Sequence, residues 1–76
     1  MKDIVWNKIM LREFRQLACL SRSEEIVLKD WAYGESIVTT AMQYHMSERT
    51  VKDIRKVLRD KYDAVQKYTP LLPERK

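Results

Sequence analysis

The sequence is poor in the residues that build turn-rich, cross-linked or membrane-embedded proteins. Its 76 residues include one glycine and two prolines, which disfavours a fold of many strands and tight turns. The single cysteine, Cys19, excludes an intramolecular disulfide. We expect Cys19 to be a small buried apolar residue in a reducing, cytoplasmic protein. No stretch approaches about 18 consecutive apolar residues, so we predict no membrane-spanning segment and no membrane partner.

Residue sets that carry out catalysis or bind metals are also missing. His45 is the only histidine, and with a single cysteine no paired-cysteine zinc site can form, so we predict no metal site. There is no phosphate-cradling glycine loop, no nucleophile with its base, and no pair of carboxylates in an evident pocket. We therefore predict that the protein is not an enzyme and needs no cofactor.

Apolar residues make up 45% of the chain, which is enough for one small core and too many for a disordered tail. The length allows one domain, residues 1–76. The formal charge of +4 is compatible with a polyanionic partner. Helical spacing of the apolar residues predicts an all-α fold, a small bundle of about four helices that contains a helix-turn-helix and has an extra N-terminal helix.

The first predicted helix spans residues 3–19, and Asp3 is a plausible start signal. Its apolar residues fit one face of a helix and are Trp6, Ile9, Met10, Phe14, Leu17 and Ala18. We expect part of this face to cover the core. It also offers more apolar surface than a small bundle obviously needs, so it is a candidate dimer surface.

Residues 20–67 form the predicted helix-turn-helix domain. Ser21 and Glu24 have capping-box spacing, with Ser23 as a competing cap, and Gly34 ends the second helix near Tyr33. Ser36 caps a short helix from residue 37 to about 44, residues 45–46 form a turn, and Ser47 caps a helix to about residue 67. Pro70 and Pro73 leave residues 68–76 as a C-terminal tail.

The last helix carries two stripes. Its apolar stripe, spaced three or four residues apart, consists of Val51, Ile54, Leu58, Tyr62 and Val65. Its cationic stripe lies roughly opposite and consists of Arg49, Lys52, Lys56 and Arg59. Such a stripe is often only a solvated helix face, which pairs such as Lys56 and Asp60 partly neutralise.

The short helix before it favours a functional interpretation. Two helices joined by about three residues, with a small residue on the inner face of the first, are typical of a helix-turn-helix. Ala41 allows close approach, Met46 fills the turn, and Val51 anchors the second helix. The leading end of that helix, residues 47–56, would then enter the major groove of double-stranded DNA.

The chain resembles the LuxR/GerE-type DNA-binding domain, which is related to region four of sigma factors. The resemblance covers roughly residues 20–64, and "SERTVK" at residues 47–52 is its most specific part. It implies a transcription regulator of a bacterium or mobile element, commonly dimeric on DNA, whose third helix reads the major groove. Because this chain adds a helix, the corresponding recognition helix is the fourth, about residues 47–62. We expect a stand-alone regulator, since no sensor domain precedes this part.

Each predicted DNA-binding residue has an assigned role. Arg49 and Lys52 would read base edges, with Asp53 accepting from a cytosine or holding a neighbouring cation. Phosphate contacts are expected from Lys56 and Arg59. Three further residues complete the set. Thr39 would contact a phosphate, and Ser47 and Thr50 would cap the helix, pack against the protein or contact the DNA backbone.

Two points stay open at this level. The protein is expected to be a homodimer, through its first helix, its fourth helix or both. The same bundle could instead serve as a protein-interaction adaptor, for example on RNA polymerase, with the basic helix against an acidic protein. Steep weakening of duplex binding by salt would separate DNA binding from an adaptor role.

Overall fold

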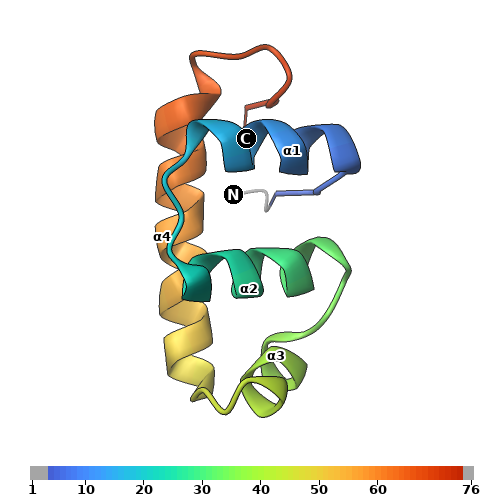
Figure 1. Ribbon diagram of the computed structural model, residues 1–76, viewed down its shortest axis with the longest axis vertical. Coiled ribbons are helices and arrows are strands. Elements are labelled where there is room, and N and C mark those ends of the chain that lie inside the picture. The colour runs from blue at the N-terminus through green and yellow to red at the C-terminus, as the bar shows by residue number, and fades with distance from the viewer. Residues whose placement is uncertain (1–3, 75–76) are drawn as a thin grey trace.

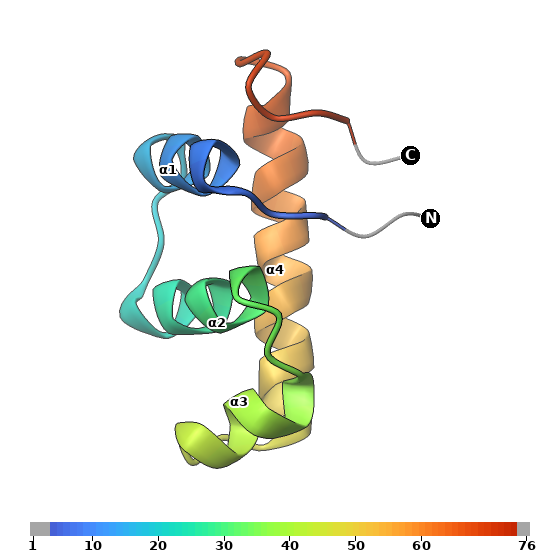
Figure 2. The ribbon, with the colours of Figure 1, turned by 90° about the vertical axis from the view of Figure 1, so that its right-hand side faces the viewer.

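The structure is a computed structural model that describes residues 4–74, and it confirms the all-α fold. Four helices follow one another along the chain: α1 (Lys8–Leu17), α2 (Arg22–Ala32), α3 (Ile37–Gln43) and α4 (Glu48–Gln66). The long α4 forms a spine, and α1 and α2 both lie across it (Figure 1). The short α3 crosses the N-terminal end of α4, and α1 lies toward its C-terminal end (Figure 2). None of the helices in the described range is long and apolar enough to span a membrane.

The first helix is shorter than predicted. Asp3, the predicted start signal, lies outside the described residues. The helix instead begins after Asn7, which has an extended backbone and whose side-chain Oδ1 accepts the Met10 N–H at 2.8 Å, as an N-cap requires. The prediction that residues 3–19 are helical was therefore wrong at both ends, because α1 ends at Leu17. Trp6 precedes the helix instead of lying on it.

The starts of the other helices were predicted correctly. Ser21 and Glu24 form the complete capping box: Ser21 Oγ accepts the Glu24 N–H at 3.3 Å, and the Glu24 carboxylate accepts the Ser21 N–H at 3.0 Å. Ser36 and Ser47 cap α3 and α4. Gly34 follows α2 with a φ of 85°, the left-handed conformation that glycine adopts without strain.

The core lies where the helices meet α4. Its fully buried side chains include Phe14 of α1, Leu28 of α2, and Val51, Leu58 and Tyr62 of α4. Trp6 adds an aromatic layer at the α1 end, with ring centroids 5.3 Å from Phe14, 5.7 Å from Trp31 and 5.7 Å from Tyr62. Aromatic pairs at these distances and tilts stabilise a core beyond their buried area. The apolar stripe of α4 is thus confirmed as its buried face.

Two expectations were wrong, one for α1 and one for the linker between α1 and α2. Ile9 is 63% exposed and Leu17 is 45% exposed, so they do not share the buried face of Met10 and Phe14. A ten-residue helix that begins at Lys8 turns only one narrow stripe toward α4. Cys19 is exposed, because it lies in the linker between α1 and α2 rather than on a helix face.

Lys61 of α4 ties this linker down. Its Nζ donates at 2.6 Å to the Cys19 carbonyl and at 2.6 Å to the Glu24 carboxylate. The hydrogen bond from Lys61 holds the pKa of Glu24 below its ordinary 4.5, against the opposing effect of partial burial. The first turn of α2 is therefore joined to the middle of the spine.

The C-terminal tail packs back onto the bundle. Thr69 and Leu72 are buried, and the Tyr62 hydroxyl donates to the Pro73 carbonyl. Leu72 belongs to the same core cluster as Phe14 and Tyr62. The predicted boundary near residue 67 marks the end of the helix, but the residues after it still contribute to the core up to Leu72.

Candidate nucleic-acid interface

The turn between α3 and α4 has a defined backbone conformation. Tyr44 closes α3 by donating its N–H to the Thr40 carbonyl at 3.2 Å. His45 has a φ of 55°, in the left-handed region that non-glycine residues rarely adopt. The Met46 N–H then donates to the Ala41 carbonyl at 2.9 Å, which turns the chain back across α3. Glycine is common at such a turn, so His45 is an unusual occupant.

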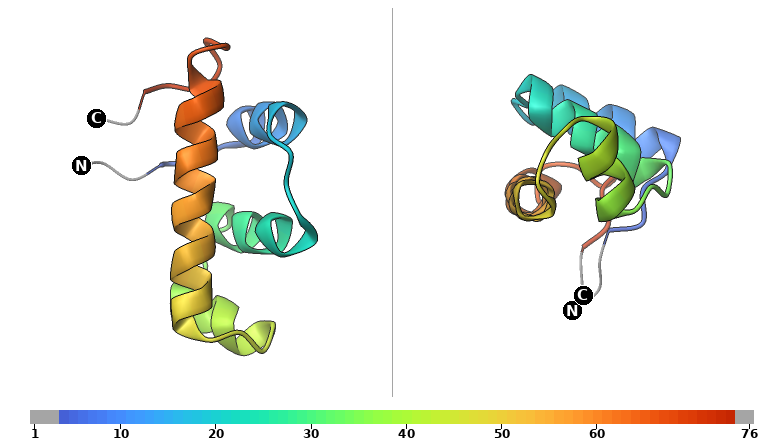
Figure 3. Two further views of the ribbon diagram at one scale, coloured as in Figure 1. Left: turned by 90° about the vertical axis from the view of Figure 1, so that its left-hand side faces the viewer. Right: turned by 90° about the horizontal axis from the view of Figure 1, so that it is seen from below.

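Small and branched residues bring the two helices together. Ala41 is 5% exposed on α3 and Val51 is fully buried on α4, with Met46 partly buried in the turn between them. The absence of a large side chain at position 41 lets the helix backbones approach closely. In the view from below, α4 is seen end-on and α3 lies beside its N-terminal end (Figure 3, right). This is the helix-turn-helix arrangement that the sequence predicts.

The leading face of α4 presents exposed charges. Arg49, Lys52 and Lys56 are all exposed, and among the described residues none of the three forms an ion pair or hydrogen bond. Glu48 and Asp53 are exposed beside them. The prediction that Asp53 holds Arg49 or Lys56 has no counterpart in this structure. Three cations and two carboxylates give this leading face a net charge of +1.

Ser47 and Thr50 are already engaged with each other. Ser47 Oγ accepts the Thr50 N–H at 3.1 Å, and the two hydroxyl oxygens are 2.8 Å apart. The same pattern joins Ser36 and Thr39 at the start of α3, where Thr39 Oγ1 accepts from Ser36 Oγ at 3.0 Å. These four side chains thus have local capping roles, and exposed Ser47 and Thr50 keep acceptor capacity toward a ligand.

Arg59 is placed differently from the other three cations. It is only partly exposed, and its guanidinium lies 5.0 Å from the Trp31 ring centroid. Arg55, which sequence reasoning missed, lies 4.9 Å from the same ring and is buried. Its Nη2 donates to the Glu35 carbonyl at 2.9 Å. A cation over an indole ring is an attractive contact, and here it joins α4 to α2.

The position of Arg55 could have been found in the sequence. It is spaced four residues after Val51 and three before Leu58, so it falls on the buried stripe. A long guanidinium side chain reaches past apolar neighbours to a polar partner, which makes it compatible with such a position. Helical spacing alone therefore places Arg55 on the buried face of α4 and the three cations of the leading face on its exposed side.

A buried carboxyl group lies behind the turn. Asp30 of α2 is 6% exposed, and its Oδ1 lies 3.5 Å from the Tyr44 hydroxyl, a long hydrogen bond between α2 and the residue that ends α3. Tyr44 itself remains 38% exposed. No sequence signal identified this contact, because it depends on how α2 and α3 are oriented.

The arrangement can position a helix and its cations against a polyanion. Over residues 4–74, no three side chains of the histidine, cysteine or acidic types are grouped as a metal site would need. Within the described residues, α4 is the last helix, as the sequence predicts. No family model, no curated protein and no solved structure matches the chain.

Proposed function

We propose that this chain is a sequence-specific double-stranded DNA-binding protein and a small regulator of transcription, with α4 as its recognition helix. One observation carries the proposal. The turn at residues 44–47 fixes α3 across α4 so that Val51 is buried while Arg49, Lys52 and Lys56 remain exposed and unpaired in the described structure. A capped helix end with free cations is the element that helix-turn-helix proteins insert into the major groove.

The residues divide by their place on α4. Arg49 and Lys52 lie in its first turns, where a helix entering the groove reaches base edges, and a bidentate arginine contact to guanine discriminates by about 1–3 kcal/mol. Lys56 lies one to two turns further along and fits a phosphate contact. Arg59 is held over Trp31, so we assign it to orienting α4, with phosphate contact as a secondary role.

The proposal includes two copies on one operator, because a single domain of this size would contact few base pairs. Half-sites about 34 Å apart would match a two-fold dimer. Of the residues considered for a dimer surface on α1, Met10 and Phe14 are buried within the chain, which leaves Ile9 and Leu17. Sedimentation of the protein alone and with a selected duplex tests this. A monomer in the absence of DNA and one protein per duplex in its presence would contradict it.

The first test is selection from a randomised duplex library at about 150 mM salt, followed by fluorescence anisotropy. We expect an enriched, roughly palindromic motif. Arg49→Ala should relax one base position, whereas Lys56→Ala should weaken all sequences alike and reduce the salt slope by about 1. No enrichment and no salt-sensitive binding would overturn the proposal.

One observation favours the adaptor role as a second candidate. Val38 and Met42 are exposed on α3, four residues apart, and form a short apolar strip beside the leading face. Duplex DNA offers few apolar groups to such a strip, whereas a protein surface readily does. Retention of RNA polymerase by the wild type, its loss in Met42→Ser, and negligible duplex affinity at physiological salt would favour the adaptor role.

A further inference from the structure

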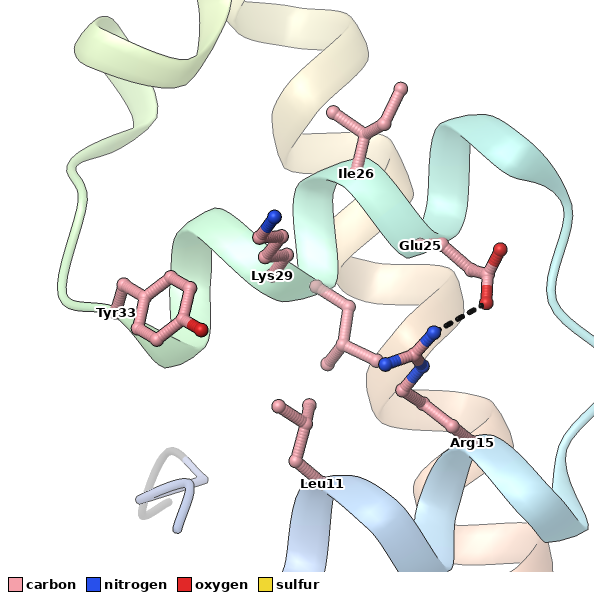
Figure 4. A pocket seen from close by; sticks show the side chains of 7 residues that line it. Leu11, Arg15, Glu25, Ile26, Lys29 and Tyr33 are labelled. Atoms are coloured by element: carbon pink, nitrogen blue, oxygen red, sulfur yellow. Dashed lines mark hydrogen bonds and ion pairs between the residues drawn. The ribbon is translucent and has the colours of Figure 1, made fainter. Parts of the chain in front are cut away.

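A groove separates α1 from α2 on the side of the bundle shown in Figure 4. It consists of two adjoining hollows of about 360 and 520 Å³, which share Leu11, Arg15, Glu25 and Tyr33. Each volume falls in the range of sites that take a ligand or a peptide side-chain cluster. We call it the α1–α2 groove.

The α1–α2 groove is strongly cationic. Its lining contains Lys8, Arg12, Arg15 and Lys29 against one carboxylate, Glu25, a net charge of +3 in a chain whose total is +4. Arg15 and Glu25 form an ion pair at 3.3 Å with both side chains about half exposed. The other three cations have no ion-pair partner in the described part of the chain. The surface therefore favours a ligand with several negative charges.

The floor of the groove is apolar. Leu11 of α1 is partly exposed and points toward α2, and the Tyr33 ring is 71% exposed at one end (Figure 4). Leu28 is a buried part of the lining, whereas Ile26 points away from α1. A strip of apolar side chains bordered by cations matches a ligand with an apolar face and acidic flanks. A phosphate backbone has no apolar face, so nucleic acid would leave this floor uncovered.

We propose that the α1–α2 groove is a docking site for an acidic amphipathic segment of a partner protein. The ten residues of α1 span about 15 Å, which is enough to hold about three turns of a bound helix. Apolar residues of that segment would cover Leu11 and Tyr33, in the groove-binding mode of amphipathic helices. Its carboxylates would face Lys8, Arg12 and Lys29, and one of them would compete with Glu25 for Arg15.

The site is separate from the leading face of α4. Helix α1 lies toward the C-terminal end of the spine, whereas α3 and the leading face lie at the opposite end (Figure 1). None of the cations assigned to DNA lines the groove. The inference therefore does not depend on the proposed function, and both surfaces could be occupied at the same time.

The test uses the full chain and a synthetic 16-residue peptide with Leu and Phe on one helical face and Glu and Asp on the other. Isothermal titration calorimetry and amide chemical-shift mapping report affinity and location. We expect saturable binding with shifts in α1 and α2. The double variant Lys8→Glu/Arg12→Glu should weaken binding about tenfold or more. Lys67→Glu, an exposed cation outside the groove, is the matched control and should change affinity less than about twofold.

Three results would overturn the inference. They are equal affinity for a peptide with Lys in place of its acidic residues, amide shifts confined to α3 and α4, and amide shifts in the groove when random duplex is added in place of the peptide. Folding of the double variant is checked by circular dichroism. A second variant, Leu11→Ser, should also weaken binding of the peptide. Unchanged affinity for the peptide in both variants would count against the site. Because Arg49→Ala should leave peptide binding intact, a failure here is distinguishable from a failure of DNA binding.

Discussion

The leading face of α4 and the α1–α2 groove are both cationic, yet they differ in shape and charge balance. The leading face projects three cations and two carboxylates from one capped helix, whereas the groove surrounds an apolar floor with four cations and one carboxylate. The lining of the groove therefore carries a larger net positive charge than the leading face. Shape, more than charge, separates the two: a projecting helix fits into a duplex groove, and a concave apolar floor fits a peptide.

The two surfaces also rest on different parts of the core. The leading face depends on the burial of Ala41 and Val51, where α3 meets α4, and on the Ser47 cap. The groove depends on the aromatic layer of Trp6, Phe14 and Tyr62, which holds α1 against the spine. Variants in one part should therefore separate the two activities.

The largest effect is expected from Phe14→Ala. Removing a fully buried ring leaves a cavity under α1 and should lower the free energy of unfolding by about 3–5 kcal/mol. Urea denaturation followed by circular dichroism measures this. Ile9→Ala, on the exposed side of the same helix, is the control and should change stability by less than about 0.5 kcal/mol. Equal losses in the two variants would show that α1 is not anchored by its aromatic face.

Arg49→Ala should separate the two surfaces functionally. Loss of a base contact should weaken binding to the selected duplex by about 1–3 kcal/mol, roughly a 5- to 150-fold rise in Kd. Binding of the acidic peptide should not change. Anisotropy with both ligands measures the contrast, and a parallel loss of both would mean that the surfaces are one site.

Ser47→Ala tests the support of the leading face. Loss of the cap to the Thr50 N–H should destabilise the protein by about 1 kcal/mol. Ser23→Ala is the matched control, because Ser23 is exposed within the first turn of α2 and Ser21 supplies the cap there. Thermal unfolding of the two variants should differ, with Ser47→Ala the less stable. A more stable Ser47→Ala would contradict the capping role.

The smallest effect concerns Glu24 in the first turn of α2. The folded pKa of Glu24 lies below its ordinary 4.5, so its carboxylate stabilises the fold above that pH and the contribution is lost as the pH falls through the folded pKa. Glutamine keeps the bond to the Ser21 N–H but does not titrate. Stability of Glu24→Gln should therefore decline less steeply than that of the wild type below pH 4.5. Parallel profiles from urea denaturation would exclude this role for Glu24.

Local signals account for the parts of the fold that the sequence predicted. Ser21, Ser36 and Ser47 begin helices because a hydroxyl caps the nearest free N–H groups, and Gly34 ends one because it accepts a positive φ. The start of α1 was mispredicted because Asp3 and Asn7 are both competent caps, and no local rule decides between them.

Features that join distant segments were not predictable in this way. Cys19 is exposed because of where the linker runs, and its carbonyl is held by Lys61, 42 residues further along. Likewise, Arg59 looks like part of a solvated stripe until Trp31 of α2 is placed beneath it. The sequence of α1 alone indicates only an ordinary charged helix. The α1–α2 groove forms because α1 and α2 both lie across α4.

The left-handed backbone at His45 has a consequence for which relatives this fold allows. Gly adopts that conformation freely, and Asn, Asp and His adopt it more readily than other residues, whereas a β-branched residue there would be strained. Relatives that keep the turn should therefore vary at position 45 only among these few residues while retaining a small residue at 41 and a cap at 47. In a relative with other residues at these positions, α3 and α4 would no longer pack against each other in the same way.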